Sequence, residues 1–136
     1  MTMPALLSAA LMLLLLLPGT LTEDSKPVPV SVVVEDTVDG AVTLTYATEV
    51  ASKGTLLDAL KTLMATNSKF TFTYIDDPNY GPSLEYVNGV AGNEDDQTFW
   101  EVLVKKSDGQ IIRPDGGIAY YIPSANDQIH LGFTKW

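Results

Sequence analysis

The chain has 136 residues, a formal net charge of −9 at pH 7 and no cysteine. This length allows one domain with a modest core, which must hold together without disulfide bonds. The negative charge argues against nucleic acid and anionic lipid membranes as partners.

The first 22 residues carry no charged side chain and contain an apolar block from Ala5 to Leu17, followed by Pro18-Gly19. The block is shorter than the roughly 20 residues that a membrane-spanning helix needs. This pattern predicts a secretory signal peptide over residues 1–22, cleaved between Gly19 and Thr22, with a short membrane anchor as the alternative. We therefore expect a secreted, extracellular protein with a flexible lead over 23–29 and one domain over 30–136.

Two strands are predicted at the start of the domain. The segment Val28–Glu35 is rich in valine, which favours a strand. In the next segment Val42, Leu44 and Tyr46 alternate with threonines, the pattern of a half-buried strand. The dipeptide Asp39-Gly40 between the two segments is typical of a hairpin turn.

One helix is predicted next. Thr55 and Asp58 have the spacing of a capping box, in which a hydroxyl and a carboxylate satisfy the free N–H groups of a helix N-terminus. We expect the helix to close at Asn67. Its apolar side chains recur at helical spacing at Leu56, Leu57, Leu60, Leu63 and Met64.

The rest of the chain is predicted to form further strands. Alternation predicts them at Phe70–Tyr74, Ser83–Asn88, Phe99–Lys105 and Gln128–Lys135. In the last strand Ile129, Leu131 and Phe133 share one face. The order of elements indicates a single α+β domain with the helix packed on an antiparallel or mixed sheet, and it is compatible with a β-grasp-like arrangement.

Groups suited to catalysis are few. His130 is the only histidine, and it lies on the opposite face of its strand from the apolar residues, so we expect it to face solvent. Acidic residues cluster at 76–77 and 94–96 without the spacing of an EF-hand, which is more typical of solvated turns. The sequence therefore predicts a protein that is not an enzyme and has no metal site. A hydrolase using Asp76 or Glu94 is the least favoured alternative.

Apolar side chains are better placed for binding. Trp100 and Val102 point to one face of their strand and Phe99 to the other, so one face can pack the core while the other presents a platform. The pair Ile111-Ile112 lies in a polar loop, where it either plugs the core or forms a contact surface.

Four motifs, in order along the chain, carry a resemblance to a known family. They are Tyr80-Gly81-Pro82-Ser83-Leu84, Val87-Asn88-Gly89-Val90-Ala91-Gly92-Asn93, Thr98-Phe99-Trp100-Glu101-Val102-Leu103 and Gly117-Ile118-Ala119-Tyr120-Tyr121-Ile122-Pro123. With them, the segment from Gly54 to Trp136 resembles the C-terminal β-domain of the vitamin B12 carriers, the family of intrinsic factor, transcobalamin and haptocorrin. The resemblance also implies a β-grasp-like fold.

The resemblance implies a binding function as well. In that family cobalamin lies flat between an α-helical barrel and the smaller β-domain, so this chain would contribute one side of the clamp and no catalysis. Apolar side chains would cover the corrin face and rim, and polar groups would hydrogen-bond its amide fringe. The positions that match the family's contacts are Asn79, Tyr80, Gly81, Ser83, Leu84, Trp100, Val102 and Ile111.

From the residues before the domain we expect no α-barrel. We therefore expect a separate α-barrel chain or a second copy of the protein to complete the enclosure. One side alone would bury roughly 300 Å² of apolar surface, worth about 7 kcal/mol at about 25 cal/mol/Å². Association costs about 4 to 15 kcal/mol, so the isolated domain should bind cobalamin weakly. The alternative function is an extracellular protein-interaction module that kept the fold and does not bind cobalamin.

Overall fold

The computed structural model describes residues 26–79, 81–114 and 116–136. The predicted signal peptide over 1–22 lies outside the described residues, and so does Tyr80. Within the described part of the chain, no helix is long and apolar enough to cross a membrane.

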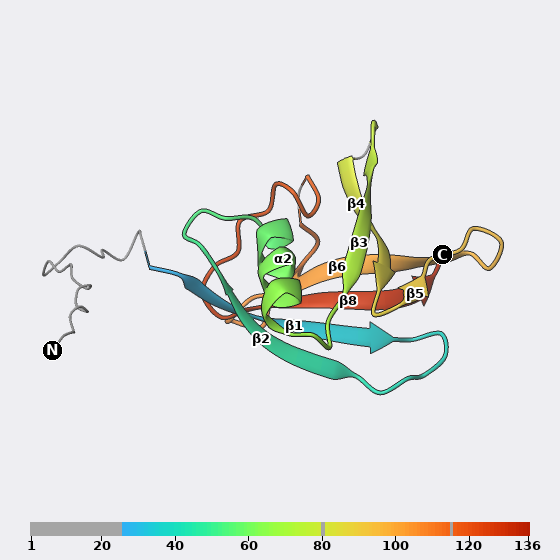
Figure 1. Cartoon of the computed structure of the whole chain (residues 1–136), viewed down its shortest axis with the longest axis horizontal. Helices are drawn as coiled ribbons and strands as arrows, with labels where there is room; N and C mark the ends of the chain where they lie inside the picture. Colours follow the sequence, from blue (N-terminus) through green and yellow to red (C-terminus); the bar gives the residue numbers. More distant parts are fainter. Residues whose placement is uncertain (1–25, 80, 115) are drawn as a thin grey trace, which may run out of the picture.

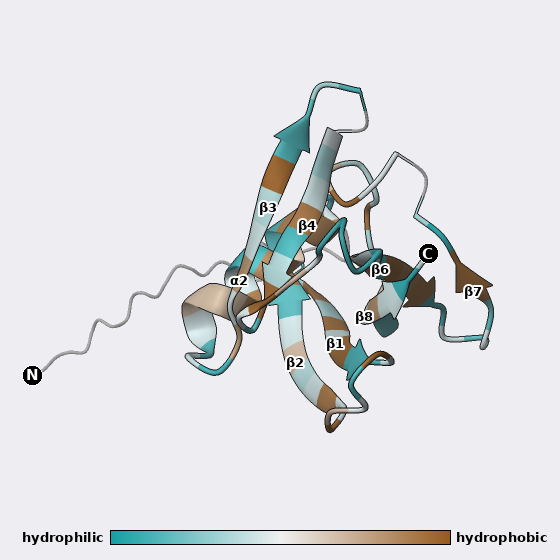
Figure 2. Cartoon of the chain, turned by 90° about the vertical axis from the view of Figure 1, so that its right-hand side faces the viewer, coloured by the Kyte–Doolittle hydropathy of each residue, from teal (hydrophilic) through white to brown (hydrophobic). Residues whose placement is uncertain are grey.

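Five strands form one mixed sheet in the order β2-β1-β8-β6-β7. Figure 1 shows β2, β1, β8 and β6 side by side, and Figure 2 labels β7. Their bounds are Val28–Asp36 for β1, Leu44–Val50 for β2, Thr98–Lys105 for β6, Ile111–Ile112 for β7 and Asp127–Lys135 for β8. β1 and β8 are a central parallel pair, and every other neighbouring pair of this sheet is antiparallel. The predicted mixed sheet, with its β-grasp-like arrangement, is confirmed.

Three further strands form a separate sheet in the order β3-β4-β5. They span Phe72–Asp77, Gly81–Val87 and Val90–Ala91. Figures 1 and 2 show the β3–β4 hairpin projecting from the main sheet on the side that also carries the helix α2. The hairpin therefore forms a wall beside the inner face of the main sheet.

Helix α2 spans Leu56–Thr66, and both halves of its predicted capping box are present. The Thr55 hydroxyl accepts a hydrogen bond from the Asp58 N–H at 3.2 Å, and the Asp58 carboxylate accepts one from the Thr55 N–H at 2.9 Å. Asn67 closes the helix, as predicted. The helix packs on the inner face of the main sheet through Leu56, Leu57, Ala59, Leu60 and Leu63.

The core lies between α2, the β3–β4 hairpin and the inner face of the main sheet. The predicted apolar face of β8 is confirmed, because Ile129, Leu131 and Phe133 are all buried. Phe70 is fully buried, and its ring lies 5.3 Å from that of Tyr46. The α+β fold class that the sequence predicts is therefore correct.

Several strand limits differ from the prediction. β1 begins at Val28, so the last two residues of the lead expected over 23–29 belong to a strand. Val42 is 82% exposed and precedes β2, because the register pairs Val34 with Leu44 and leaves 37–43 as a loop. The prediction of Val42 as part of a half-buried strand was therefore wrong.

The strands around the hairpin also differ. Phe70 precedes β3, which starts at Phe72, and β4 starts at Gly81 rather than at Ser83. β5 and β7 were not predicted. Each has two residues, which is too short for an alternating pattern to be visible.

Candidate ligand-binding site

A hollow of about 170 Å³ lies between β4, β6 and the segment 113–118. One of its walls, β4, belongs to the hairpin that projects from the main sheet (Figure 1). Its lining residues are Pro82, Ser83 and Leu84 from β4, Trp100 and Val102 from β6, and Arg113, Pro114, Gly117 and Ile118 from the segment after β7.

β4 forms one wall of the hollow because antiparallel pairing with β3 keeps it projecting from the main sheet. Ser83 pairs with Ile75 and Leu84 with Tyr74, next to a register shift between Thr73 and Tyr74. Leu84 is half-buried and packs against the core, whereas Ser83 is exposed. This wall therefore presents an apolar side chain beside a hydroxyl.

The floor is formed by alternate residues of β6, which point to the inner face of the sheet. The ring of Trp100 is 7% exposed and lies 5.1 Å from the ring of Phe133. Its Nε1–H donates a hydrogen bond to the carbonyl of Val90 at 2.8 Å, which joins β6 to β5. Trp100 is thus chiefly a packing residue with one edge at the hollow, and Val102 is the more accessible of the two.

The opposite wall is a loop held by the N-terminus of α2. The free N–H groups of the first helical turn need acceptors. The Leu57 N–H donates to the carbonyl of Ile118 at 2.9 Å, and the Leu56 N–H donates to the carbonyl of Tyr121 at 2.8 Å. Gly117 has φ +82°, and a Cβ placed there would lie 3.8 Å from the carbonyl oxygen of Pro82. The loop therefore closes against β4.

A largely buried ionic network holds the continuation of the same loop in place. Asp127 Oδ2 accepts hydrogen bonds from Lys106 Nζ at 2.9 Å, Tyr121 Oη at 2.8 Å and the Ser124 N–H at 2.9 Å. Burial lowers the pKa of Lys106, but hydrogen bonds to Tyr121 and Asp127 outweigh that effect and raise it above its usual value. Burial raises the pKa of Tyr121. Both side chains therefore keep their protons through the neutral range.

One arginine is among the lining residues. Arg113 is the only arginine of the sequence, and its side chain is 68% exposed. Its Nη2 lies 2.8 Å from Glu101 Oε2, on the neighbouring strand β6. Such exposed ion pairs contribute little to stability. Arg113 thus lines the hollow, while its guanidinium pairs with Glu101, which alternates with the lining residues Trp100 and Val102 along β6.

Half of the predicted contact residues meet at the hollow, namely Ser83, Leu84, Trp100 and Val102. Ile111 does not, because it lies in the edge strand β7, paired with Lys105, and is 62% exposed. The two alternatives for the Ile111-Ile112 pair were core packing and a contact surface. Neither holds for both residues, since Ile112 packs against the core and Ile111 points out.

The other predicted contacts lie at the turn of the β3–β4 hairpin. Asn79 is exposed, and its N–H donates to Asp77 Oδ1 at 2.7 Å. Gly81 opens β4 with φ +74°. Neither lines the hollow. Tyr80, between them, lies outside the described residues.

Sequence reasoning missed part of the lining. Pro82, Gly117 and Ile118 stood in the motifs that carried the resemblance, yet they were not named as contacts. Arg113 and Pro114 lie in a loop without periodicity, and the only signal for Arg113 was its being the sole arginine.

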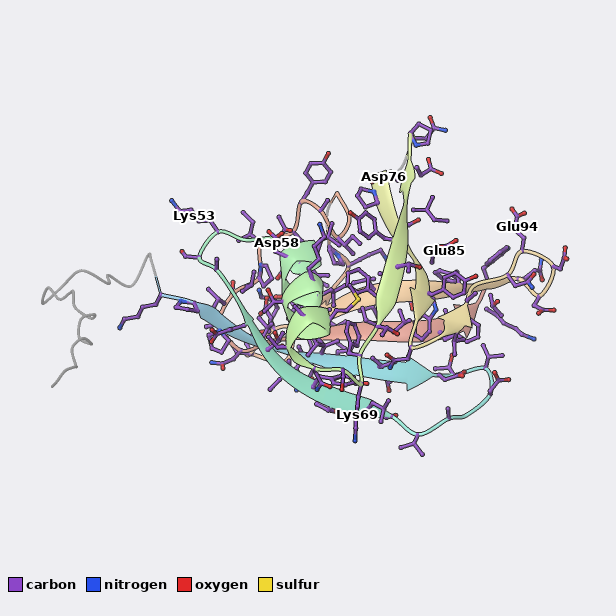
Figure 3. All side chains as sticks on the ribbon, in the orientation of Figure 1. Lys53, Asp58, Lys69, Asp76, Glu85 and Glu94 are labelled. Carbon is purple, nitrogen blue, oxygen red and sulfur yellow. The ribbon has the colours of Figure 1, made fainter. Side chains whose placement is uncertain are left out.

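The groups that the sequence singled out for metal or acid–base chemistry, His130, Asp76 and Glu94, lie on different elements. His130 Nδ1 lies 3.3 Å from Glu35 Oε1, and its side chain is 27% exposed, on the sheet face away from the core. Figure 3 shows Asp76 on the projecting hairpin and Glu94 on the distant loop before β6, so they do not form a pair. Among the described residues, no group of three or more His, Asp or Glu side chains could hold a metal ion.

Comparison with known proteins gives two relatives in sequence. Cobalamin binding intrinsic factor of Mus musculus is 31% identical over 129 residues, and that of Rattus norvegicus is 30% identical over 130 residues. Each alignment covers 88% of this chain and 30% of the relative, so the chain spans about a third of the length of these relatives. No protein-family model matches the chain.

Two solved structures share the fold. Haptocorrin in complex with Cbi superposes with a TM-score of 0.68 at 18% identity, covering 82% of this chain and 26% of haptocorrin. A Ruminococcus gnavus protein named for a suspected metal-binding role superposes with a TM-score of 0.56 at 13% identity, covering 80% of this chain and 98% of that protein.

Proposed function

The chain is related in sequence and fold to the C-terminal domain of the cobalamin carriers, and from this premise we propose that it binds cobalamin without catalysis. The carrying observation is the hollow between β4, β6 and the loop 113–118. Four of the eight contact positions implied by the resemblance line it, from strands β4 and β6. A concave, mostly apolar surface with a few polar groups is the usual form of a small-molecule site.

The size of the hollow indicates how the ligand would be held. Its volume of about 170 Å³ lies below the range of about 300 to 1,000 Å³ that is usual for pockets enclosing a drug-sized ligand. A corrinoid is larger than most drugs, so the hollow would receive one edge of the macrocycle with its amide arms. Leu84 and Val102 would contact the apolar rim, and Ser83 would hydrogen-bond an amide.

Because this domain would contact only one side of the ligand, tight binding needs a second protein surface on the other side. Burial of roughly 300 Å² would contribute about 7 kcal/mol, against an association cost of about 4 to 15 kcal/mol. We propose that a separate α-barrel chain or a second copy of this protein closes over the ligand. Without it, the Kd of the domain for cobalamin should lie in the micromolar to millimolar range, which is roughly −8 to −4 kcal/mol.

The test is a titration of the purified domain, residues 23–136, with cyanocobalamin. Quenching of Trp fluorescence and the cobalamin absorbance would both follow binding. We expect saturable binding that weakens when Leu84→Ala or Tyr80→Ala is introduced. The control is Leu44→Ala, because Leu44 is also a leucine of a strand but belongs to β2 and does not line the hollow. Absence of any saturable change up to millimolar ligand would refute cobalamin binding and favour the protein-interaction module.

We also propose that the protein is secreted, which rests on the apolar segment within residues 1–22. Expression of the whole chain in a eukaryotic cell and N-terminal sequencing of the protein in the medium would test this. A mature N-terminus between residues 20 and 23 is expected. Retention of residues 1–22 on membrane-bound protein would instead support the anchor.

A further inference from the structure

We infer that Tyr120 is a ligand-contacting residue whose ring extends the apolar wall of the hollow toward the corrin. This inference rests on the proposed function and names a residue outside the contact set implied by the resemblance. Tyr120 is 70% exposed, although a tyrosine ring is largely apolar. Isolated exposed aromatic residues are common on proteins, so the assignment depends on how Tyr120 is held and what it adjoins.

The ring of Tyr120 packs against Gly116, the residue that precedes Gly117. A Cβ placed on Gly116 would lie 3.1 Å from Tyr120 Cβ and 3.3 Å from its Cδ2, so a larger residue at 116 would push the ring away. The next residue, Gly117, lines the hollow and adjoins the carbonyl of Pro82. The Tyr120 ring therefore lies within one residue of the hollow's edge.

The backbone on both sides of Tyr120 is fixed. The N–H groups of Tyr120 and Tyr121 both lie 3.3 Å from the carbonyl of Gly117, which closes a turn. The carbonyls of Ile118 and Tyr121 accept hydrogen bonds from the first turn of α2. The Tyr121 hydroxyl is bound to Lys106 and Asp127 on the inner side.

Because of these hydrogen bonds, the side chains of neighbouring residues in the loop point in opposite directions. Ile118 is buried and Tyr121 points into the ionic network, which leaves Tyr120 directed outward. A side chain on a fixed backbone loses little conformational freedom on binding, and tyrosine has only two side-chain torsions to order. The arrangement suits a flat, apolar-edged macrocycle that enters the hollow and lies against the ring.

The experiment compares cyanocobalamin affinity among wild type, Tyr120→Ala, Tyr120→Phe and Tyr86→Ala. Tyr86 is the matched control, because it is an exposed tyrosine (42%) of β4, paired with Ala91 of β5 and outside the loop that carries Tyr120. We expect Tyr120→Ala to weaken binding roughly tenfold. Tyr120→Phe and Tyr86→Ala should stay within about twofold of wild type, since ring contact carries the effect. The urea midpoints of all four proteins should agree, since both tyrosines are exposed.

Wild-type affinity in Tyr120→Ala, an equal loss in Tyr120→Phe, or an equal loss in Tyr86→Ala would overturn the role of Tyr120. If Leu84→Ala still weakens binding in that case, the proposed function stands while this inference falls. If the wild type shows no saturable binding, the proposed function fails and the inference fails with it.

Discussion

The carboxylate of Asp127 lies 2.9 Å from the ammonium of Lys106, and the Asp127 side chain is only 1% exposed. The same carboxylate oxygen accepts hydrogen bonds from Tyr121 and from the Ser124 backbone. One buried charge thus joins the end of β6, the loop that walls the hollow and the start of β8. The other oxygen, Oδ1, is buried without a hydrogen-bond partner, so the network depends on Oδ2.

Asp127→Asn should lower the free energy of unfolding by about 2 kcal/mol. Removing one charge of a largely buried pair leaves the other incompletely compensated, and the amide satisfies fewer of the three donors. Urea unfolding followed by Trp fluorescence measures the change. Asp95→Asn is the control, because Asp95 lies in an exposed turn. Equal midpoints for the two variants would show that the network contributes nothing specific.

Alkaline pH should weaken the same network. The pKa values of Lys106 and Tyr121 are both raised above their usual values of 10.5 and 10.0. A group with a raised folded-state pKa contributes stability that is fully present below the unfolded-state pKa and is lost as pH rises through the folded-state pKa. The contribution is therefore constant at neutral pH and disappears above about pH 10.

The measurement is the difference in unfolding free energy between wild type and Lys106→Met as a function of pH. We expect a constant difference from about pH 7 to 9 that shrinks at higher pH. Lys105→Met, which removes an exposed neighbouring ammonium, should show no such trend. A difference that grows with pH would contradict the assignment.

Local signals predicted the helix and the central strands. The capping box of Thr55 and Asp58 joins residues three apart, so the sequence contains all of it. Likewise, the alternation in β8 reports directly which side chains are buried. The start of β2 could not be predicted, because it is set by the register with β1, which is a contact between segments.

The candidate site was predictable only in part for the same reason. Trp100 and Val102 follow from alternation and the resemblance, and both line the hollow. Arg113 and Pro114 reach the hollow because the loop after β7 is tied to α2 and to Asp127. The hydrogen bonds to α2 join residues far apart in the sequence, so no local pattern indicates them.

Trp100→Phe should loosen the small sheet from the main sheet. The substitution removes the hydrogen bond from Nε1 to the carbonyl of Val90 and leaves a space beside Phe133. We expect a loss of about 2 kcal/mol in unfolding free energy. Faster amide hydrogen exchange in β5 should accompany it. Trp136→Phe is the control, since Trp136 is 60% exposed, and an equal loss there would contradict the role of the Trp100 hydrogen bond.

Gly117→Ala should destabilise the wall of the hollow through its backbone and not through a clash. Gly117 has φ +82°, where an L side chain is strained, yet the added Cβ would meet nothing closer than 3.8 Å. We expect a loss of about 1 kcal/mol. In Gly132→Ala the new Cβ also has space, at 4.0 Å from the Glu101 carbonyl, and φ is not positive. That variant should therefore be neutral or slightly stabilising, because alanine restricts the unfolded chain. Thermal unfolding of the two variants distinguishes the causes: equal losses would mean that crowding, and not the left-handed backbone of the loop, governs both sites.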